Sequence, residues 1–253
     1  MKKLVKKFYN KFTSYKTFEE VTLNDITYRV VEKRNSLSPK NTERALVFKK
    51  PESSEMFFHS KIYTDSKKVF QPHGVAFQKI FDCWGKHFQV ENALVLGCAG
   101  CTIPRFLAFR FLNCKILGVE YEEKFVELAK KYFLIDEIKN NFTLIHGDAF
   151  AFMEEYEFEE KQDIVLVDVF SENQCPEEVF SKEFIKNLFD KTSENALIVF
   201  NLLGKGTDEI LSFSKSINED FNKKHVIASG KKAYLLLIKA EDDEKANAFI
   251  SSI

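Results

Sequence analysis

From residue 72 onward, the chain alternates between short apolar runs and longer stretches with the periodicity of amphipathic helices. The apolar runs are nearly uninterrupted, which is typical of strands that helices cover on both faces. They lie at 93–97, 115–120, 142–147, 163–168 and 196–201. The helical stretches lie at 75–86, 103–112, 123–134, 149–155, 179–190 and 207–222. Strands that are separated by helices predict βαβ units and a parallel sheet.

Two further apolar runs follow the last of these helices. HVIAS (225–229) and AYLLLIKA (233–240) are joined by three residues, a connection short enough for a hairpin. The predicted fold class is therefore α/β: a Rossmann-like, mostly parallel sheet of seven strands, the last of which runs antiparallel.

The residues before this region have a different pattern. Residues 2–12 place apolar side chains on one helical face and lysines on the other, which predicts a short basic amphipathic helix. Residues 19–70 contain short β-like runs separated by turn-forming residues, which predicts a small, mostly antiparallel β unit. We therefore expect three parts: a basic helix at 1–18, a β unit at 19–71 and a Rossmann-like domain at 72–253.

Charge is distributed unevenly over these parts. Residues 1–70 contain 16 Lys and Arg but 8 Asp and Glu, although the whole chain has a net charge of −1. A basic segment can meet nucleic acid or an anionic membrane, but it can also be solvated or face the acidic remainder of the chain. We expect the second case and no nucleic-acid partner. Apolar runs of 18 residues and the apolar core of a secretory signal are both absent, so we expect a cytoplasmic protein without a membrane span.

The five cysteines raise a separate question at residues 94–107, LVLGCAGCTIPRFL. An odd number of cysteines without repeated spacing does not describe a disulfide framework. Cys98 and Cys101 form a C-x-x-C, which could be a redox pair, half of a metal site, or part of a nucleotide-binding glycine loop. A second C-x-x-C or an H-x-x-H, which would complete four zinc ligands, is absent from the sequence, so we expect no metal.

Glycine or acidic residues follow four of the predicted parallel strands. The loop from Gly97 to Cys101 follows the first strand, and Glu120 ends the second, 23 residues after Gly97. Asp148, with Ala149 beside it, follows the third strand, and Asp168 ends the fourth. Because an open parallel sheet binds ligands at the carboxyl ends of its strands, this edge is the predicted site.

Each carboxylate has a chemical role available and a structural alternative. Glu120 can accept hydrogen bonds from ribose hydroxyls, or it can cap a neighbouring helix. Asp148 can accept from an adenine amine, or it can be the N-cap of the following helix. Asp168 can meet a cationic or amine-bearing group, or it can form a hydrogen bond within its loop.

The segments ALVLGCAGCTIPRFL, ILGVEYEEKFVELAKKYF, LIHGDAFAFM, DIVLVDVF, PEEVFSKEFIKNL and LIVFNL occur in this order. Together they resemble the spermidine synthase-like branch of the class I S-adenosylmethionine-dependent methyltransferases. The resemblance implies that S-adenosylmethionine, or its decarboxylated form, is the cofactor and that a small amine is the acceptor. It also implies a homodimer as a possible assembly. The implied cofactor contacts are Gly97, Cys98, Ala99, Gly100, Glu120, Tyr121, Asp148, Ala149 and Asp168, and Asp168 is the implied catalytic residue.

Two departures from the family pattern bear on function. Ala99 and Cys101 stand where the usual loop has glycines. Aminopropyltransferases of this branch have a D-x-x-D after the fourth strand, whereas here Asp168 is followed by Ser171 at the second position and Glu172 one residue later. Serine is not a comparable base or amine counter-ion. We therefore predict a methyltransferase acting on a small acceptor, which we expect to be an amine, with an aminopropyltransferase and a non-catalytic nucleoside-binding or scaffold protein as alternatives.

Overall fold

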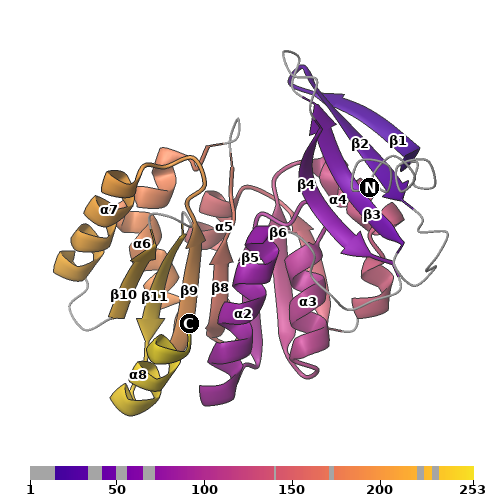
Figure 1. The fold of residues 1–253 in the computed structure, drawn as a ribbon. Helices are drawn as coiled ribbons and strands as arrows, with labels where there is room; N and C mark the ends of the chain where they lie inside the picture. The colour runs from indigo at the N-terminus through magenta and orange to yellow at the C-terminus, as the bar shows by residue number, and fades with distance from the viewer. Residues whose placement is uncertain are drawn as a thin grey trace, which may run out of the picture.

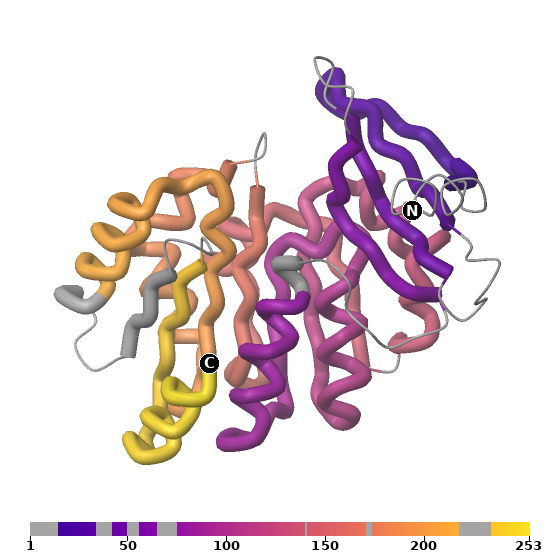
Figure 2. The backbone as a smooth tube through the Cα atoms, viewed as in Figure 1, coloured from indigo at the N-terminus to yellow at the C-terminus, as the bar shows by residue number. Residues whose placement is uncertain are grey.

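The computed structural model describes residues 15–33, 42–49, 56–64, 72–139, 141–170, 174–220, 225–229 and 234–253. The predicted helix at 2–12 and the loop residues Ser171 and Glu172 lie outside these ranges. The described chain forms a four-stranded sheet beside a larger seven-stranded sheet that helices cover on both faces (Figures 1 and 2).

The larger sheet has seven strands, as predicted. In spatial order its strands are β10 (His225–Ser229), β11 (Tyr234–Lys239), β9 (Thr192–Asn201), β8 (Gln162–Val167), β5 (Asn92–Leu96), β6 (Lys115–Glu120) and β7 (Phe142–His146). The five strands from β9 to β7 pair in parallel, and β11 pairs antiparallel with both β9 and β10. The α/β class and the antiparallel last strand are therefore confirmed.

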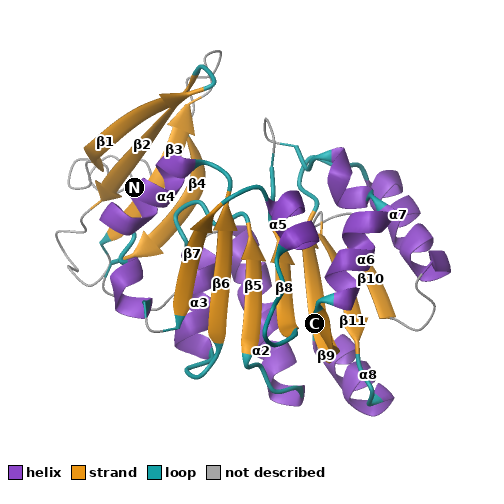
Figure 3. Cartoon of the chain, turned by 180° about the vertical axis from the view of Figure 1, so that it is seen from behind, coloured by secondary structure: helices purple, strands orange, loops and turns teal. Residues whose placement is uncertain are grey.

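The helices of the larger part are α2 (Pro72–His87), α3 (Thr102–Arg110), α4 (Glu123–Tyr132), α5 (Ala149–Glu155), α6 (Lys182–Asp190), α7 (Thr207–Asp220) and α8 (Asp243–Ser252). Two 3₁₀ turns lie at Ile135–Ile138 and Glu177–Phe180. Residues of α2, α3 and α8 pack on one face of the sheet, and those of α5, α6 and α7 pack on the other (Figures 1 and 3). None of the described helices is long and apolar enough to cross a bilayer.

The uninterrupted apolar runs follow directly from this layering. In β5, Ala93 and Val95 belong to the core beneath α2, α3 and α8, whereas Leu94 and Leu96 belong to the core beneath α5, α6 and α7. All four side chains are at most 1% exposed. Because successive strand residues point to opposite faces, a strand covered on both sides has no position where a polar side chain meets water.

The smaller sheet is antiparallel throughout, with its strands in sequence order: β1 (Tyr15–Leu23), β2 (Ile26–Lys33), β3 (Glu43–Lys49) and β4 (Phe57–Tyr63). A two-residue turn joins β1 to β2, and both of its residues, Asn24 and Asp25, have positive φ, as a tight hairpin requires. The first strand begins four residues before the predicted β unit.

The smaller sheet packs against α4, next to the carboxyl ends of β5 and β6. A buried cluster joins the two parts, made of Val30, Leu46, Ile62, Ala99, Phe125, Leu128 and Phe133. At its rim, Arg44 donates to Glu32 and to the Tyr132 carbonyl, both at 2.6 Å. The packing of the two parts brings β4 next to the loop that follows β5.

Candidate functional site

Gly97 brings the ends of β5 and β8 into contact. Its φ is 85°, and a Cβ at this position would lie 2.2 Å from the carbonyl oxygen of Asp168. The Asp168 amide in turn donates to the Leu96 carbonyl at 2.8 Å. Only glycine combines this backbone conformation with such a close approach, so Gly97 sets the path of the loop.

Glu120 holds the same loop from the end of β6. Its Oε2 accepts hydrogen bonds from the amides of Cys98 at 2.9 Å and Ala99 at 2.6 Å, and its Oε1 accepts from Glu122 at 3.0 Å. The residue is 7% exposed. A carboxylate offers about four lone-pair sites, so three amides leave room for another donor. Glu120 thus supports this loop rather than capping a helix, and the predicted ribose contact stays a prediction.

Ser60 of β4 completes the loop's hydrogen bonding. The Gly100 amide donates to Ser60 Oγ at 2.9 Å, and next to it Thr102 Oγ1 donates to the Lys61 carbonyl at 3.2 Å. The Gly97 amide donates to the Val119 carbonyl and the Cys101 amide to the Cys98 carbonyl. All five backbone N–H groups from 97 to 101 therefore donate to atoms of the protein itself.

Cys98 and Cys101 are buried, free thiols within this loop. Burial raises the pKa of the Cys98 thiol well above its usual range, and the nearby Cys101 thiol, Glu120 and Asp168 act in the same direction. Ala99 and Cys101 adopt positive φ values of 42° and 55°. The loop thus keeps the left-handed conformation at both positions where a glycine is replaced, at a strain of about 1–2 kcal/mol per residue.

The thiols are expected to resist modification in the native protein. Burial also raises the pKa of Cys114 and of Cys175 to about 12. A raised pKa keeps Cys98, Cys114 and Cys175 protonated at pH 8, and the thiolate is the reactive form; Cys83 and Cys101 are buried. Ellman's reagent should therefore react slowly before unfolding and with all five cysteines after it. Rapid labelling of Cys98 in the folded protein, identified by peptide mass spectrometry, would instead support the redox interpretation of the C-x-x-C.

Asp148 caps the helix that follows β7. Its Oδ1 accepts from the amides of Phe150 at 2.8 Å and Ala151 at 2.9 Å. Next to it, the Gly147 amide donates to the Glu120 carbonyl at 3.0 Å, which joins the ends of β6 and β7. Ala149 is buried, and the Tyr121 side chain is 66% exposed. The N-cap role is therefore present, and the adenine contact stays a prediction.

Asp168 has a hydrogen-bond partner that was not predicted from the sequence. Asn201 ends β9 and is 7% exposed, and its Nδ2 donates to Asp168 Oδ1 at 2.7 Å. The criterion that selected the other residues, a polar side chain at the end of an apolar run, also applies to Asn201 in LIVFN. Ser60 had no such signal, because it reaches the loop from a strand 40 residues away.

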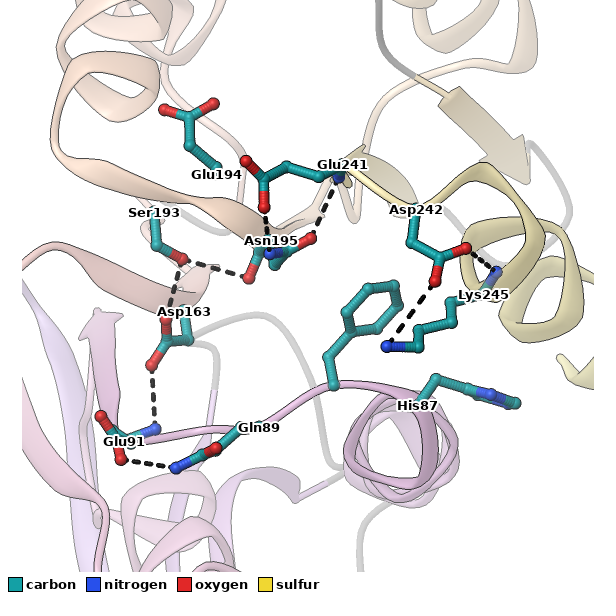
Figure 4. Close-up of a pocket in the computed structure, with 11 residues that line it drawn as sticks. His87, Gln89, Glu91, Asp163, Ser193, Glu194, Asn195, Glu241, Asp242 and Lys245 are labelled. Carbon is teal, nitrogen blue, oxygen red and sulfur yellow. Dashed lines mark hydrogen bonds and ion pairs between the residues drawn. The ribbon is translucent and has the colours of Figure 1, made fainter.

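A hollow of about 560 Å³ lies at the opposite edge of the sheet (Figure 4). Asp163 and Asn195 in its wall come from the amino-terminal parts of β8 and β9. Asp163 accepts from the amides of Glu91 and Asn92 and from Ser193 Oγ. Within the part of the chain that the structure describes, no cluster of three or more His, Cys, Asp or Glu could hold a metal ion.

Part of the chain is similar to a known domain family. Residues 90–205 match the model of the spermine/spermidine synthase domain. The chain is 24% identical over 161 residues to the polyamine aminopropyltransferase of Vibrio vulnificus (strain CMCP6). That alignment covers 62% of this chain and 53% of the relative, so it spans about half of the relative's length.

Solved structures extend the similarity over nearly the whole chain. A probable spermidine synthase from Corynebacterium glutamicum ATCC 13032 has a TM-score of 0.67 at 16% identity, covering 94% of this chain and 86% of that one. The fold is spermidine synthase-like. Human methyltransferase-like protein 13, solved in complex with SAH, has a TM-score of 0.56 at 15% identity. The match covers 73% of this chain and 92% of that one. The chain therefore shares its fold with both of these proteins.

Proposed function

We propose that the chain is an aminopropyltransferase that binds decarboxylated S-adenosylmethionine and transfers its aminopropyl group to a small amine. The hydrogen bonds of the Gly97–Cys101 loop are the observation that favours the decarboxylated ligand over S-adenosylmethionine. All five N–H groups of the loop donate to protein atoms, so the loop has no donor ready for the carboxylate of S-adenosylmethionine. Glu120 and Asp168 also make this edge acidic, which favours a ligand with a cationic rather than an anionic end.

The site residues have distinct roles in this proposal. Glu120 binds the ribose through its remaining lone-pair site, and Asp148 contacts the base. Asp168 orients the acceptor amine and takes up the proton that its nitrogen loses. The sulfonium ligand supplies an electrophilic carbon: a nitrogen–carbon bond forms there, the carbon–sulfur bond breaks, and the sulfur leaves as a neutral thioether. Positioning and charge are then the main contributions of the protein.

Methyl transfer from S-adenosylmethionine is the second candidate, and Ser171 is the feature that favours it. A serine in place of the second acid weakens the case for a diamine acceptor. The two reactions have different products, so they can be separated directly. Purified protein is incubated with decarboxylated S-adenosylmethionine and putrescine, cadaverine or spermidine, and in parallel with S-adenosylmethionine and the same amines.

Release of methylthioadenosine that depends on the amine supports aminopropyl transfer. Release of S-adenosylhomocysteine supports methyl transfer instead. If neither product forms while the protein still binds methylthioadenosine, both catalytic proposals are wrong and a nucleoside-binding protein without turnover remains.

Ser60→Ala is expected to change ligand preference. It removes the acceptor of the Gly100 amide and leaves a buried N–H that a ligand carboxylate can satisfy. We expect the affinity for S-adenosylmethionine, relative to its decarboxylated form, to rise by about five- to tenfold, as one hydrogen bond of about 1 kcal/mol implies. Calorimetric titration of both ligands measures the ratio.

Thr102→Val is the matched control for this variant. It removes the neighbouring hydrogen bond from Thr102 Oγ1 to the Lys61 carbonyl of β4, but every amide of the Gly97–Cys101 loop keeps its acceptor. The affinity ratio should then stay at the wild-type value. An unchanged ratio in Ser60→Ala would show that the Gly100 amide does not face the ligand.

A further inference from the structure

Asn201 and Asp168 lie side by side at the carboxyl edge of the sheet. They directly follow Phe200 and Val167, which are register partners in the parallel strands β9 and β8. Asn201 is almost fully buried, and its amide nitrogen donates to Asp168 Oδ1 at 2.7 Å. A buried side chain at a strand end is held by the strand itself, so this pair has a defined geometry.

The hydrogen bond fixes which way the Asn201 amide points. An ionised carboxylate only accepts hydrogen bonds, so the NH₂ group of Asn201 must face it. The Asn201 carbonyl oxygen is attached to the same carbon and therefore points away from the Asp168 oxygen that its NH₂ group contacts. The pair thus offers a charged acceptor, the Asp168 carboxylate, and a neutral one, the Asn201 carbonyl oxygen.

This combination suits an ammonium group. An ammonium has three N–H donors and no acceptor, so one carboxylate satisfies only part of its hydrogen-bonding capacity. A second carboxylate next to the first would oppose its ionisation, whereas an amide oxygen accepts a hydrogen bond without adding charge. The sequence has Ser171 where a second acid would stand, which leaves this acceptor role to another residue.

We propose that Asn201 is a specificity-determining residue that binds the amine acceptor together with Asp168, its carbonyl oxygen accepting from the ammonium while its NH₂ group holds the carboxylate. The inference rests on the proposed transferase function, because it assigns the acceptor subsite of that reaction. It predicts a primary amine as the acceptor class.

The test measures binding rather than turnover. Wild type, Asn201→Leu and Asn201→Asp are saturated with methylthioadenosine and titrated with putrescine by calorimetry. Asn201→Leu should bind the amine at least about tenfold more weakly, because an acceptor of a charged donor is lost. Asn201→Asp keeps an oxygen acceptor, and a single proton shared by the two neighbouring carboxyls restores the hydrogen bond between them, so most of that affinity should return. All three proteins should bind methylthioadenosine equally well.

Asn195→Leu is the matched control. Asn195 lies on the same strand at the opposite edge, and its amide also contacts a carboxylate, donating to Glu241 at 3.3 Å. This variant should lose no amine affinity.

The remaining outcomes each overturn a defined claim. If the wild type fails to bind methylthioadenosine, the proposed function is wrong, and the inference falls with it. If the wild type binds methylthioadenosine but no amine, or if Asn201→Leu binds putrescine as the wild type does, only the inference is wrong. If Asn201→Asp is weaker than Asn201→Leu, the residue serves only to hold Asp168.

Discussion

Replacing Gly97 with alanine is expected to abolish ligand binding and to lower the free energy of unfolding by about 3 kcal/mol or more. Two effects combine at this position. The φ of 85° is strained for any residue with a Cβ, and the new methyl group would lie 2.2 Å from the Asp168 carbonyl oxygen. Since that oxygen belongs to the backbone, the ends of β5 and β8 must separate, and the loop then loses its contact with Glu120.

Gly147→Ala is the matched control for this prediction. Gly147 also follows a parallel strand at the same edge, but a Cβ there would meet nothing closer than Val119 Cγ1 at 4.0 Å. We expect nearly wild-type stability in urea unfolding and unchanged affinity for methylthioadenosine. Equal behaviour of the two alanine variants would mean that the close approach at Gly97 does not exist in solution.

Glu120→Ala is expected to lose both stability and ligand affinity. The carboxylate accepts three backbone amides, from Cys98, Ala99 and Glu122. Leaving these donors unpaired at a buried position should lower the free energy of unfolding by at least about 3 kcal/mol. Binding of methylthioadenosine should become undetectable, because the loop loses its support and the ribose loses its acceptor.

Asp163→Ala is the control that separates the loss of stability from the loss of ligand affinity. Asp163 also accepts three hydrogen bonds, from the Glu91 and Asn92 amides and from Ser193 Oγ, but at the amino edge of the sheet. This variant should lose stability in urea unfolding while it keeps its affinity for methylthioadenosine at a temperature where it is folded. A Glu120→Ala protein that binds the nucleoside as tightly as Asp163→Ala does would contradict the proposed ribose contact.

The strands and their mostly parallel arrangement could be predicted, because strands that are buried on both faces appear in the sequence as uninterrupted apolar runs. The position of the candidate site was inferred from the carboxyl ends of those runs, where the polar residues lie. The last helix, α8, was missed: it has few apolar residues, of which Ala246 and Phe249 are fully buried. Its place is decided by packing of Phe249 against Trp84 of α2, a contact that no local pattern reveals.

The placement of the candidate residues at strand ends could be predicted, but their hydrogen-bond partners could not. Gly97, Glu120, Asp148 and Asp168 could be selected because each follows or ends a strand. Their hydrogen bonds could not be predicted, because they depend on how distant segments meet. Ser60 contacts the loop only because the smaller sheet packs on α4, and Asn201 meets Asp168 only because β8 and β9 are neighbours.

The proposed function is tested most directly by calorimetric titration of the wild-type protein with methylthioadenosine, decarboxylated S-adenosylmethionine and S-adenosylmethionine. We expect the first two ligands to bind and the third to bind at least about tenfold more weakly, because the loop amides are paired and the edge is acidic. Tighter binding of S-adenosylmethionine would contradict aminopropyl transfer and favour methyl transfer. Binding of none of the three by a folded protein would contradict a nucleoside site at this edge.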